Sequence, residues 1–295
     1  MIFEVLVREF LNGTVKNDLF SLVNGFEDGK WRYPLFNSYI WDNIGQTSLT
    51  SKERDSLVNH SLLMAAAKNL RLTDEADSVG EGSELAEIIL YGIMKDYYRA
   101  LSVVPKIFYK QNPRDNAKGS DSVHIVIENE NDFSLWLGEA KFYNSIEDAR
   151  FNSIVQTVEN SLQTEKLKKE NSIITNLSEL DAVIENTTLR DRIRTLLSDA
   201  ASIDDLKPKL HVPILLLHEC KHTNACTEMS EDYRQKIRIH HRERATSYFA
   251  KQTAALVNIH KISDITFHII LLPVPEKAEV VKRFIDGVKY FKGQK

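Results

Sequence analysis

The chain has 295 residues, of which 42% are hydrophobic and 27% are charged, and its formal net charge is −4. This composition can bury a sizeable core, and the length suggests about two domains or one elaborated domain. The acidic balance does not favour general nucleic-acid binding, so a nucleic acid would have to meet local basic patches. With only two cysteines, the chain is expected to be cytoplasmic and to have no disulfide framework. No apolar run approaches the roughly 20 residues that span a bilayer, so no membrane contact is expected.

Residues 1–80 are predicted to form an N-terminal α+β extension packed on the core. Apolar and polar residues alternate from Phe3 to Phe10, which predicts a strand. A short apolar helix or turn is expected around residues 19–23. Apolar residues at helical spacing over residues 51–70 predict a helix capped by Ser51.

Residues 81–295 are predicted to form the main domain. Its expected elements are a helix capped by Ser83, strands at 103–109, 122–128 and 133–143, a helix after Ser145, a helical insertion at about 164–208, a strand at 212–218, a helix at about 230–259, a strand at 265–273 and a C-terminal helix. Such a mixture packs as a central mixed sheet flanked by helices, which is an α/β fold.

Acidic and basic side chains are concentrated where two of these strands begin and end. Asp121 stands at the mouth of one strand, and Glu139-Ala140-Lys141 ends the next one. Side chains two residues apart on a strand point to the same face, roughly 7 Å apart, so Glu139 and Lys141 project together. If the two strands form a hairpin that turns near residues 129–132, Asp121 lies opposite this pair.

Such a set of groups suits metal-dependent phosphodiester hydrolysis. Mg²⁺ (or Mn²⁺) takes carboxylate, carbonyl and water oxygens, which Asp121, Glu139 and the Ala140 carbonyl would supply. Lys141 could orient the attacking water or meet the developing negative charge. A helical acid, Glu84 or Glu87, could complete the shell, although acids in a first turn also simply favour the helix dipole.

The ordered array resembles the PD-(D/E)xK nuclease superfamily. Its elements are a helix with a glutamate (Glu84 or Glu87), then Asp121, then Glu139-Ala140-Lys141. The resemblance implies a restriction-endonuclease-like core and a further polar residue on the next helix, for which Gln156 is the candidate. Ser120 stands where many members of the superfamily have proline before the aspartate, which makes the match less specific.

The chain also resembles the nuclease subunit of the Hachiman anti-phage defence system. The residues that carry this resemblance are Glu84-Leu85-Ala86-Glu87-Ile88-Ile89-Leu90, Lys118-Gly119-Ser120-Asp121 and Leu137-Gly138-Glu139-Ala140-Lys141-Phe142-Tyr143. The resemblance implies a bacterial defence endonuclease that cuts DNA together with a superfamily-2 helicase. The alternatives are a non-catalytic nucleic-acid or helicase-binding module on a nuclease-like fold, and an RNA-cleaving nuclease.

Two other groups of residues could form sites. His218, Cys220, His222 and Cys226 are zinc-ligand types, but their spacing matches no common zinc finger. A strand end followed by a polar loop is the better interpretation of these residues. Arg234, Arg238 and Arg242 recur every four residues of a predicted helix. They could bind phosphates, or they could form a solvated face paired with Glu231, Asp232 and Glu243. A surface for a partner protein would fit as well.

Overall fold

One mixed sheet of seven strands runs through the molecule, in the order β1-β2-β9-β8-β7-β6-β5. A computed structural model describes residues 2–12, 16–71, 83–110 and 119–293. The strands are β1 Glu4–Asn12, β2 Asn17–Val23, β5 Leu101–Val104, β6 Ser122–Asn129, β7 Asp132–Tyr143, β8 Leu210–Glu219 and β9 Thr266–Val274, beside a small ribbon of β3 Phe26–Glu27 and β4 Lys30–Trp31.

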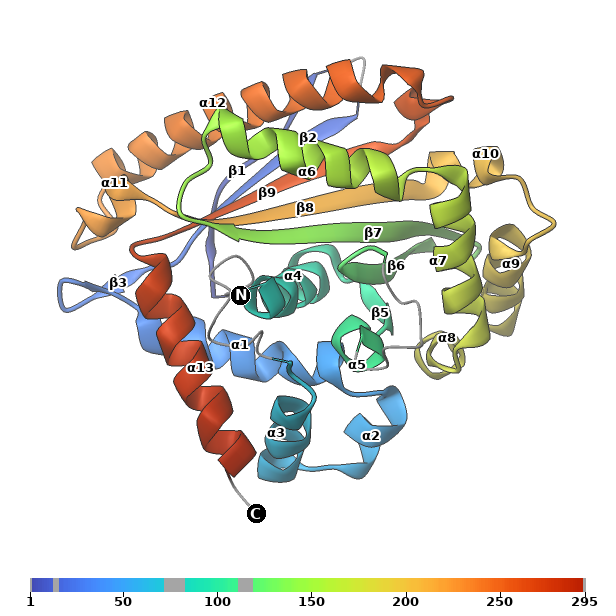
Figure 1. Cartoon of the computed structure of the whole chain (residues 1–295), viewed down its shortest axis with the longest axis horizontal. Coiled ribbons are helices and arrows are strands. Elements are labelled where there is room, and N and C mark those ends of the chain that lie inside the picture. The colour runs from blue at the N-terminus through green and yellow to red at the C-terminus, as the bar shows by residue number, and fades with distance from the viewer. Residues whose placement is uncertain (1, 13–15, 72–82, 111–118, 294–295) are drawn as a thin grey trace.

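Helices cover both faces of this sheet, which confirms the predicted α/β architecture (Figure 1). On one face lie α6 Asp148–Ser161 and α12 Glu231–Ala255, and on the other lie α1 Tyr33–Ser48, α4 Ser83–Tyr98 and α13 Lys277–Gly293. The remaining helices are α2 Ser51–Ser56, α3 Asn59–Lys68, α5 Lys106–Lys110, α7 Thr164–Asn176, α8 Glu179–Val183, α9 Thr187–Leu197, α10 Ile203–Leu206 and α11 Lys221–Asn224, with the short 3₁₀ helices η1 Lys207–Lys209, η2 Leu256–Asn258 and η3 Ile262–Asp264. The helices α7 to α10 occupy the segment where the helical insertion was predicted.

The inner strand β7 contributes to a different hydrophobic core on each face. Leu135 and Leu137 belong to the core beneath α6 and α12, whereas Trp136 and Ala140 belong to the core beneath α1, α4 and α13. Successive side chains of a strand point to opposite faces. Glu139, at an odd-numbered position, therefore faces the α6 and α12 layer.

The first two strands extend the central sheet. β2 pairs antiparallel with β1 and parallel with β9, so the prediction of an apolar helix or turn around residues 19–23 is wrong. All seven residues of β2 are buried, and a short continuous apolar run cannot be distinguished from a buried helix by periodicity. The sheet thus includes strands from both sides of the domain boundary predicted at residue 80, and the division into domains stays a prediction.

Two further predictions about secondary structure are wrong. Residues 103–109 are not one strand, because β5 ends at Val104 and α5 begins directly after Pro105. Residues 51–70 form two helices, α2 and α3, and Thr50 rather than Ser51 is the N-cap. The Thr50 side chain accepts from the backbone of Glu53, whose carboxylate accepts from the Thr50 backbone in return, a capping box.

Among the described residues, none of the helices is sufficiently long and apolar to cross a membrane.

His124 is a buried titratable group in the core beneath α4. It lies on β6, and its ring centroid is 4.5 Å from that of Tyr91. Burial lowers the pKa of His124 from 6.5 to about 3. Neither ring nitrogen has a hydrogen-bond partner among the described residues, so the core holds a neutral imidazole whose removal breaks no hydrogen bond.

The pKa of His124 predicts acid sensitivity. The unfolded chain protonates His124 below about pH 6.5 and the folded protein does not, so the free energy of unfolding falls as the pH drops from about 6.5 toward 3. At pH 5 this one residue should lower it by about 2 kcal/mol. Denaturant unfolding at pH 7 and pH 5 should show a smaller acid loss in His124→Leu, by about that amount. An identical loss in both proteins would contradict the assignment.

Candidate active site

The β6–β7 hairpin brings Asp121 to the Glu-x-Lys motif. The backbone N–H of Asp121 donates to the Gly138 carbonyl at 2.8 Å, and Ser122 is the register partner of Gly138. From the opposite strand, the backbone N–H of Ala140 donates to Asp121 Oδ2 at 3.1 Å. The Asp121 carboxylate is therefore fixed against the backbone between Glu139 and Lys141.

Lys141 joins the two carboxylates. Its Nζ lies 3.1 Å from Asp121 Oδ2 and 3.3 Å from Glu139 Oε2. The Lys141 side chain is 29% exposed, whereas that of Glu139 is 5% exposed. The three predicted side chains thus form one cluster, with the ammonium group more accessible than the glutamate.

The electrostatics of this cluster are unusual for two acids and a lysine. Burial raises the pKa of Glu139 to about 8, and the neighbouring charge of Asp121 adds to the rise, while Lys141 opposes it. Burial alone would lower the pKa of Lys141, but the attraction of Asp121 and Glu139 outweighs it and the pKa is raised. Lys141 therefore stays positively charged, and the proton affinity of Glu139 is raised above that of an ordinary carboxylate.

Glu139 opens onto a cavity of about 340 Å³. The cavity lies between the hairpin and the helices α6 and α7, and its lining residues are Gly119, Ser120, Glu139, Thr157, Asn160, Ser161, Lys166 and Glu170. The predicted helix residue Gln156 does not line this cavity, because it is exposed and donates to Glu159 on its own helix. Thr157, Asn160 and Ser161, which are three and four residues apart, form the helix face toward the cavity.

The two acids predicted on α4 differ in position. Glu84 accepts a hydrogen bond from the backbone of Arg71 at 2.9 Å. Glu87 is buried, at 5% exposure, and lies one turn before Leu90. A methyl group added at Gly138 would lie 3.0 Å from Leu90 Cδ2, so this face of α4 packs on the strand residue that precedes Glu139.

Comparison with known protein families supports the resemblance to the Hachiman defence system. The family model of HamA matches residues 2–288, nearly the whole chain. The chain belongs to the HamA family. HamA is a protein of the Hachiman anti-phage defence system, so this chain has a role in a multi-component antiviral defence. No curated protein matches the chain.

A buried ion pair in this HamA-family chain was not foreseen from the sequence. Lys106 Nζ lies 2.7 Å from Glu170 Oε2, and both residues are buried. Glu170 also accepts from the backbone N–H of Ser120 at 3.0 Å. The Lys106–Glu170 pair thus holds the segment that leads into Asp121, and it is called the brace below.

Gly119 is required by this brace. A Cβ atom at Gly119 would lie 1.5 Å from Glu170 Oε1, so any other residue would push the Glu170 carboxylate out of its place beside Lys106. The sequence did not single out Glu170, because it follows the basic run Lys166-Leu167-Lys168-Lys169. It did not single out Lys106, because residues 103–109 were predicted to be a strand. A glycine immediately before the Ser120-Asp121 entry was the only visible signal.

Two carboxylates, a backbone carbonyl and water match the ligands that Mg²⁺ prefers. Within the described ranges, however, no group of three or more His, Cys, Asp or Glu side chains is arranged to hold a metal ion. The hypothesis of a zinc site at His218, Cys220, His222 and Cys226 is therefore wrong for these residues. Both ring nitrogens of His218 already have partners, the Glu219 carbonyl and His241 Nε2.

The arginine stripe of α12 is paired with acids. Arg238 pairs with Glu231, as the solvated-face interpretation expected. Arg234 and Arg242 instead reach β1, where they lie 2.7 Å from Glu4 and from Glu9 respectively. Phosphate binding by this stripe stays a prediction, and it would have to compete with these ion pairs.

The buried Lys106–Glu170 pair is expected to contribute to the free energy of unfolding. Replacing Lys106 with Met leaves the buried Glu170 carboxylate without its cation, and this should lower the free energy of unfolding by about 3–5 kcal/mol. The double variant Lys106→Met/Glu170→Gln should be more stable than the single one, because the uncompensated charge is gone. Both are measured by denaturant unfolding.

The matched control is Lys236→Met. Lys236 pairs with Asp232 on the surface, where the two side chains are 54% and 73% exposed, and surface pairs contribute about 1 kcal/mol or less. A Lys106→Met effect no larger than that of Lys236→Met would show that the brace does not stabilise the site.

Proposed function

We propose that this HamA-family chain is a metal-dependent DNA endonuclease of the PD-(D/E)xK type. The observation that carries the proposal is the convergence of Asp121, Glu139 and Lys141 at one end of the β6–β7 hairpin, with Glu139 opening onto a cavity. A structural ion pair alone needs one acid beside one lysine. Here a second acid lies beside the first, and burial together with the charge of Asp121 raises the pKa of Glu139. Such a shift is typical of functional sites.

Each residue has a distinct role in this proposal. Asp121 and Glu139, with the Ala140 carbonyl, would hold Mg²⁺ or Mn²⁺. The bound ion would supply Lewis acidity toward the phosphate and acidify a water molecule. Lys141 carries a permanent positive charge at the more exposed side of the cluster. It can orient the attacking water and offset the negative charge that develops on the phosphate.

The proposal includes a partner. The sequence contains no Gly-x-x-x-x-Gly-Lys-Ser/Thr phosphate loop, so ATP-driven strand separation would have to come from another subunit, and we propose a superfamily-2 helicase. Membership of a multi-component defence system supports this assignment. We further propose that the helicase restrains cleavage until infection, since an unrestrained nuclease would damage the host. Equal activity of the isolated chain and the complex would contradict this restraint.

The catalytic cluster predicts a loss of cleavage without a loss of fold. Glu139→Gln, Asp121→Asn and Lys141→Met should each reduce Mg²⁺-dependent cleavage of DNA to background. EDTA should do the same to the unchanged protein. Cleavage is followed on plasmid and linear DNA, with and without the helicase, and folding is checked by thermal unfolding of each variant.

The control for these variants is Glu159→Gln on α6, which removes an acid next to Gln156 but outside the cavity lining. It should cleave normally. Full cleavage by both Glu139→Gln and Lys141→Met would disprove the nuclease assignment and leave a binding module on a nuclease-like fold. Cleavage of RNA in preference to DNA would replace the substrate and keep the site.

The two acids of α4 provide a second prediction. Glu87 lies on the face of α4 that packs against Gly138, and Glu84 bonds to the backbone of Arg71. Glu87→Gln should therefore slow cleavage by about 10- to 100-fold, as loss of a group supporting the metal ligands does. Glu84→Gln should have little effect. Single-turnover cleavage rates test this, and a larger loss in Glu84→Gln would reverse the assignment.

A further inference from the structure

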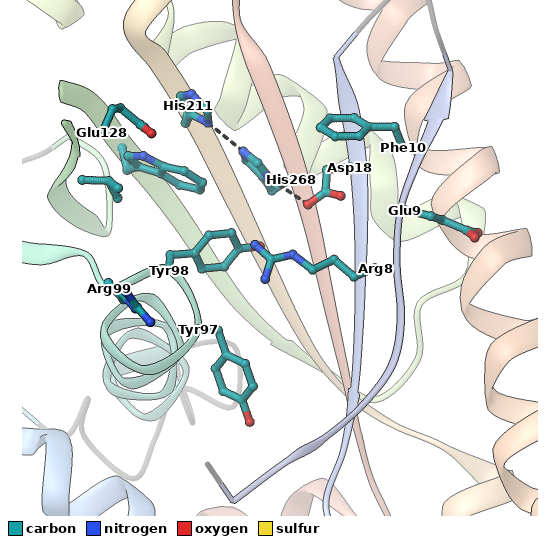
Figure 2. A pocket seen from close by; sticks show the side chains of 12 residues that line it. Arg8, Glu9, Phe10, Asp18, Tyr97, Tyr98, Arg99, Glu128, His211 and His268 are labelled. Atoms are coloured by element: carbon teal, nitrogen blue, oxygen red, sulfur yellow. Dashed lines mark hydrogen bonds and ion pairs between the residues drawn. The ribbon is translucent and has the colours of Figure 1, made fainter. Parts of the chain in front are cut away.

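A second pocket lies on the opposite face of the sheet from Glu139. Its volume is about 420 Å³, and Figure 2 shows its side chains at the end of α4 and across strands β1, β2, β8 and β9. Trp136, one of its lining residues, occupies an even-numbered position of β7, whereas Glu139 and Lys141 occupy odd-numbered ones. The pocket therefore shares β7 with the proposed nuclease site but none of its side chains.

A chain of three polar residues crosses the floor of this pocket. Asp18 Oδ2 lies 2.9 Å from His268 Nδ1, and His268 Nε2 lies 2.9 Å from His211 Nδ1. Asp18 and His268 are buried, at 4% and 5% exposure. Asp18, His268 and His211 come from three different strands.

The hydrogen bonds assign the protons if both histidines are neutral. His268 must donate from Nδ1 to the Asp18 carboxylate, so its Nε2 can only accept. His211 must then donate from Nδ1, which leaves its Nε2 as an acceptor. No hydrogen bond of His211 Nε2 occurs among the described residues. Burial lowers the pKa of His211 to about 3, which keeps it neutral near pH 7.

Aromatic rings surround the hydrogen-bonded chain of Asp18, His268 and His211, which is called the histidine relay below. The ring of Trp136 stacks on His211 and on His268, with centroids 4.3 and 4.4 Å apart. The ring centroids of Tyr98 and Trp136 are 4.8 Å apart. The guanidinium of Arg8 lies over the Tyr98 ring, 4.9 Å from its centroid. Trp136, Tyr98 and His268 are buried, whereas His211 is partly exposed and Arg8 is exposed. The Arg8 guanidinium, which lines the pocket together with His211, is therefore the flat group on which a planar ring can stack.

The mouth of the pocket carries Arg8 and Arg99. In the part of the chain that the structure describes, neither Arg8 nor Arg99 forms an ion pair. The acid next to Arg8, Glu9, is already paired with Arg242 of α12. Both Arg8 and Arg99 are exposed, so they are available to an anion.

Arg99 also has an unfavourable backbone conformation. Its φ is +53°, in the left-handed region where helices commonly end on glycine. A residue with a side chain costs roughly 1 kcal/mol more there than glycine. A position that favours glycine thus carries an arginine that lines a pocket, which is evidence for a use of the side chain.

We propose that this pocket binds a nucleotide. Its phosphate would meet Arg99, its base would stack on the Arg8 guanidinium at the edge of the aromatic cluster, and a sugar hydroxyl would donate to His211 Nε2. The volume exceeds what inorganic phosphate needs and lies within the usual range of small-ligand sites. The ligand is either a free nucleotide or the terminal nucleotide of a single strand, because both present the same groups.

The test uses the full chain with Glu139→Gln, so that oligonucleotide probes stay intact. Binding of AMP, of a 5′-phosphorylated octathymidylate and of inorganic phosphate is measured by isothermal titration calorimetry. Replacing Arg99 with Gly should weaken nucleotide binding at least about tenfold, since a charge-assisted hydrogen bond contributes about 1.5–3 kcal/mol. The same variant should keep or raise the unfolding temperature, because glycine favours the left-handed conformation.

Arg8→Gln should weaken binding in the same way, and the matched control Arg283→Gln should not. Arg283 pairs with Glu279 on α13 and does not line the pocket. Arg99-dependent binding of AMP identifies a free-nucleotide site, and Arg99-dependent binding of the octathymidylate alone identifies a strand-end site. Binding of neither probe, or equally tight binding of inorganic phosphate, would overturn the proposal. Because the background lacks Glu139, this result is independent of whether the chain is a nuclease.

Discussion

Two hydrogen bonds hold the Asp121 carboxylate in place, and the geometry of the candidate active site depends on them. One oxygen, Oδ2, accepts from the backbone of Ala140 and from the ammonium of Lys141. The backbone bond can form only while β6 and β7 keep their register, with Asp121 N–H donating to Gly138. A slip of one residue would turn Glu139 and Lys141 to the other face. The chemistry of the site therefore depends on the pairing of two strands.

Packing around the hairpin maintains that register. On one face, the absence of a side chain at Gly138 lets Leu90 of α4 approach the strand. On the other, the absence of one at Gly119 admits the Glu170 carboxylate, which is charge-paired with Lys106. Neither contact would tolerate an added methyl group without displacement. The two glycines thus allow helices to fix the hairpin from both faces.

The two-faced sheet gives the chain two separate polar sites. Along β7, alternate residues face alternate layers, so Glu139 and Lys141 meet the layer of α6 and α12, while Trp136 meets the layer of α4. Each site places charges at low exposure and compensates them locally, with Lys141 between two acids in one and with Asp18 at the end of a histidine relay in the other. β7 can therefore contribute to two sites, each with different side chains.

The sequence by itself determined the features that depend on residues close together in the chain, within one helix or strand or in two consecutive ones. The alternation around Glu139 and Lys141, and the polar turn between two apolar runs, were sufficient to predict the hairpin and the convergence of Asp121. The helical period was sufficient to predict α4 and α6. It did not show that Thr157 rather than Gln156 lines the cavity, because a shift of one position on a helix is set by what packs against it.

Only the tertiary structure decided the contacts between residues far apart in the chain. The apolar run of β2 becomes a strand because β9 pairs with it, about 250 residues later, and periodicity cannot show a distant partner. Lys106 meets Glu170, and Asp18 meets His268, for the same reason. Long-range pairing of buried charges follows from how layers stack. Local patterns therefore revealed the proposed nuclease cluster, and the fold alone revealed its brace and the second pocket.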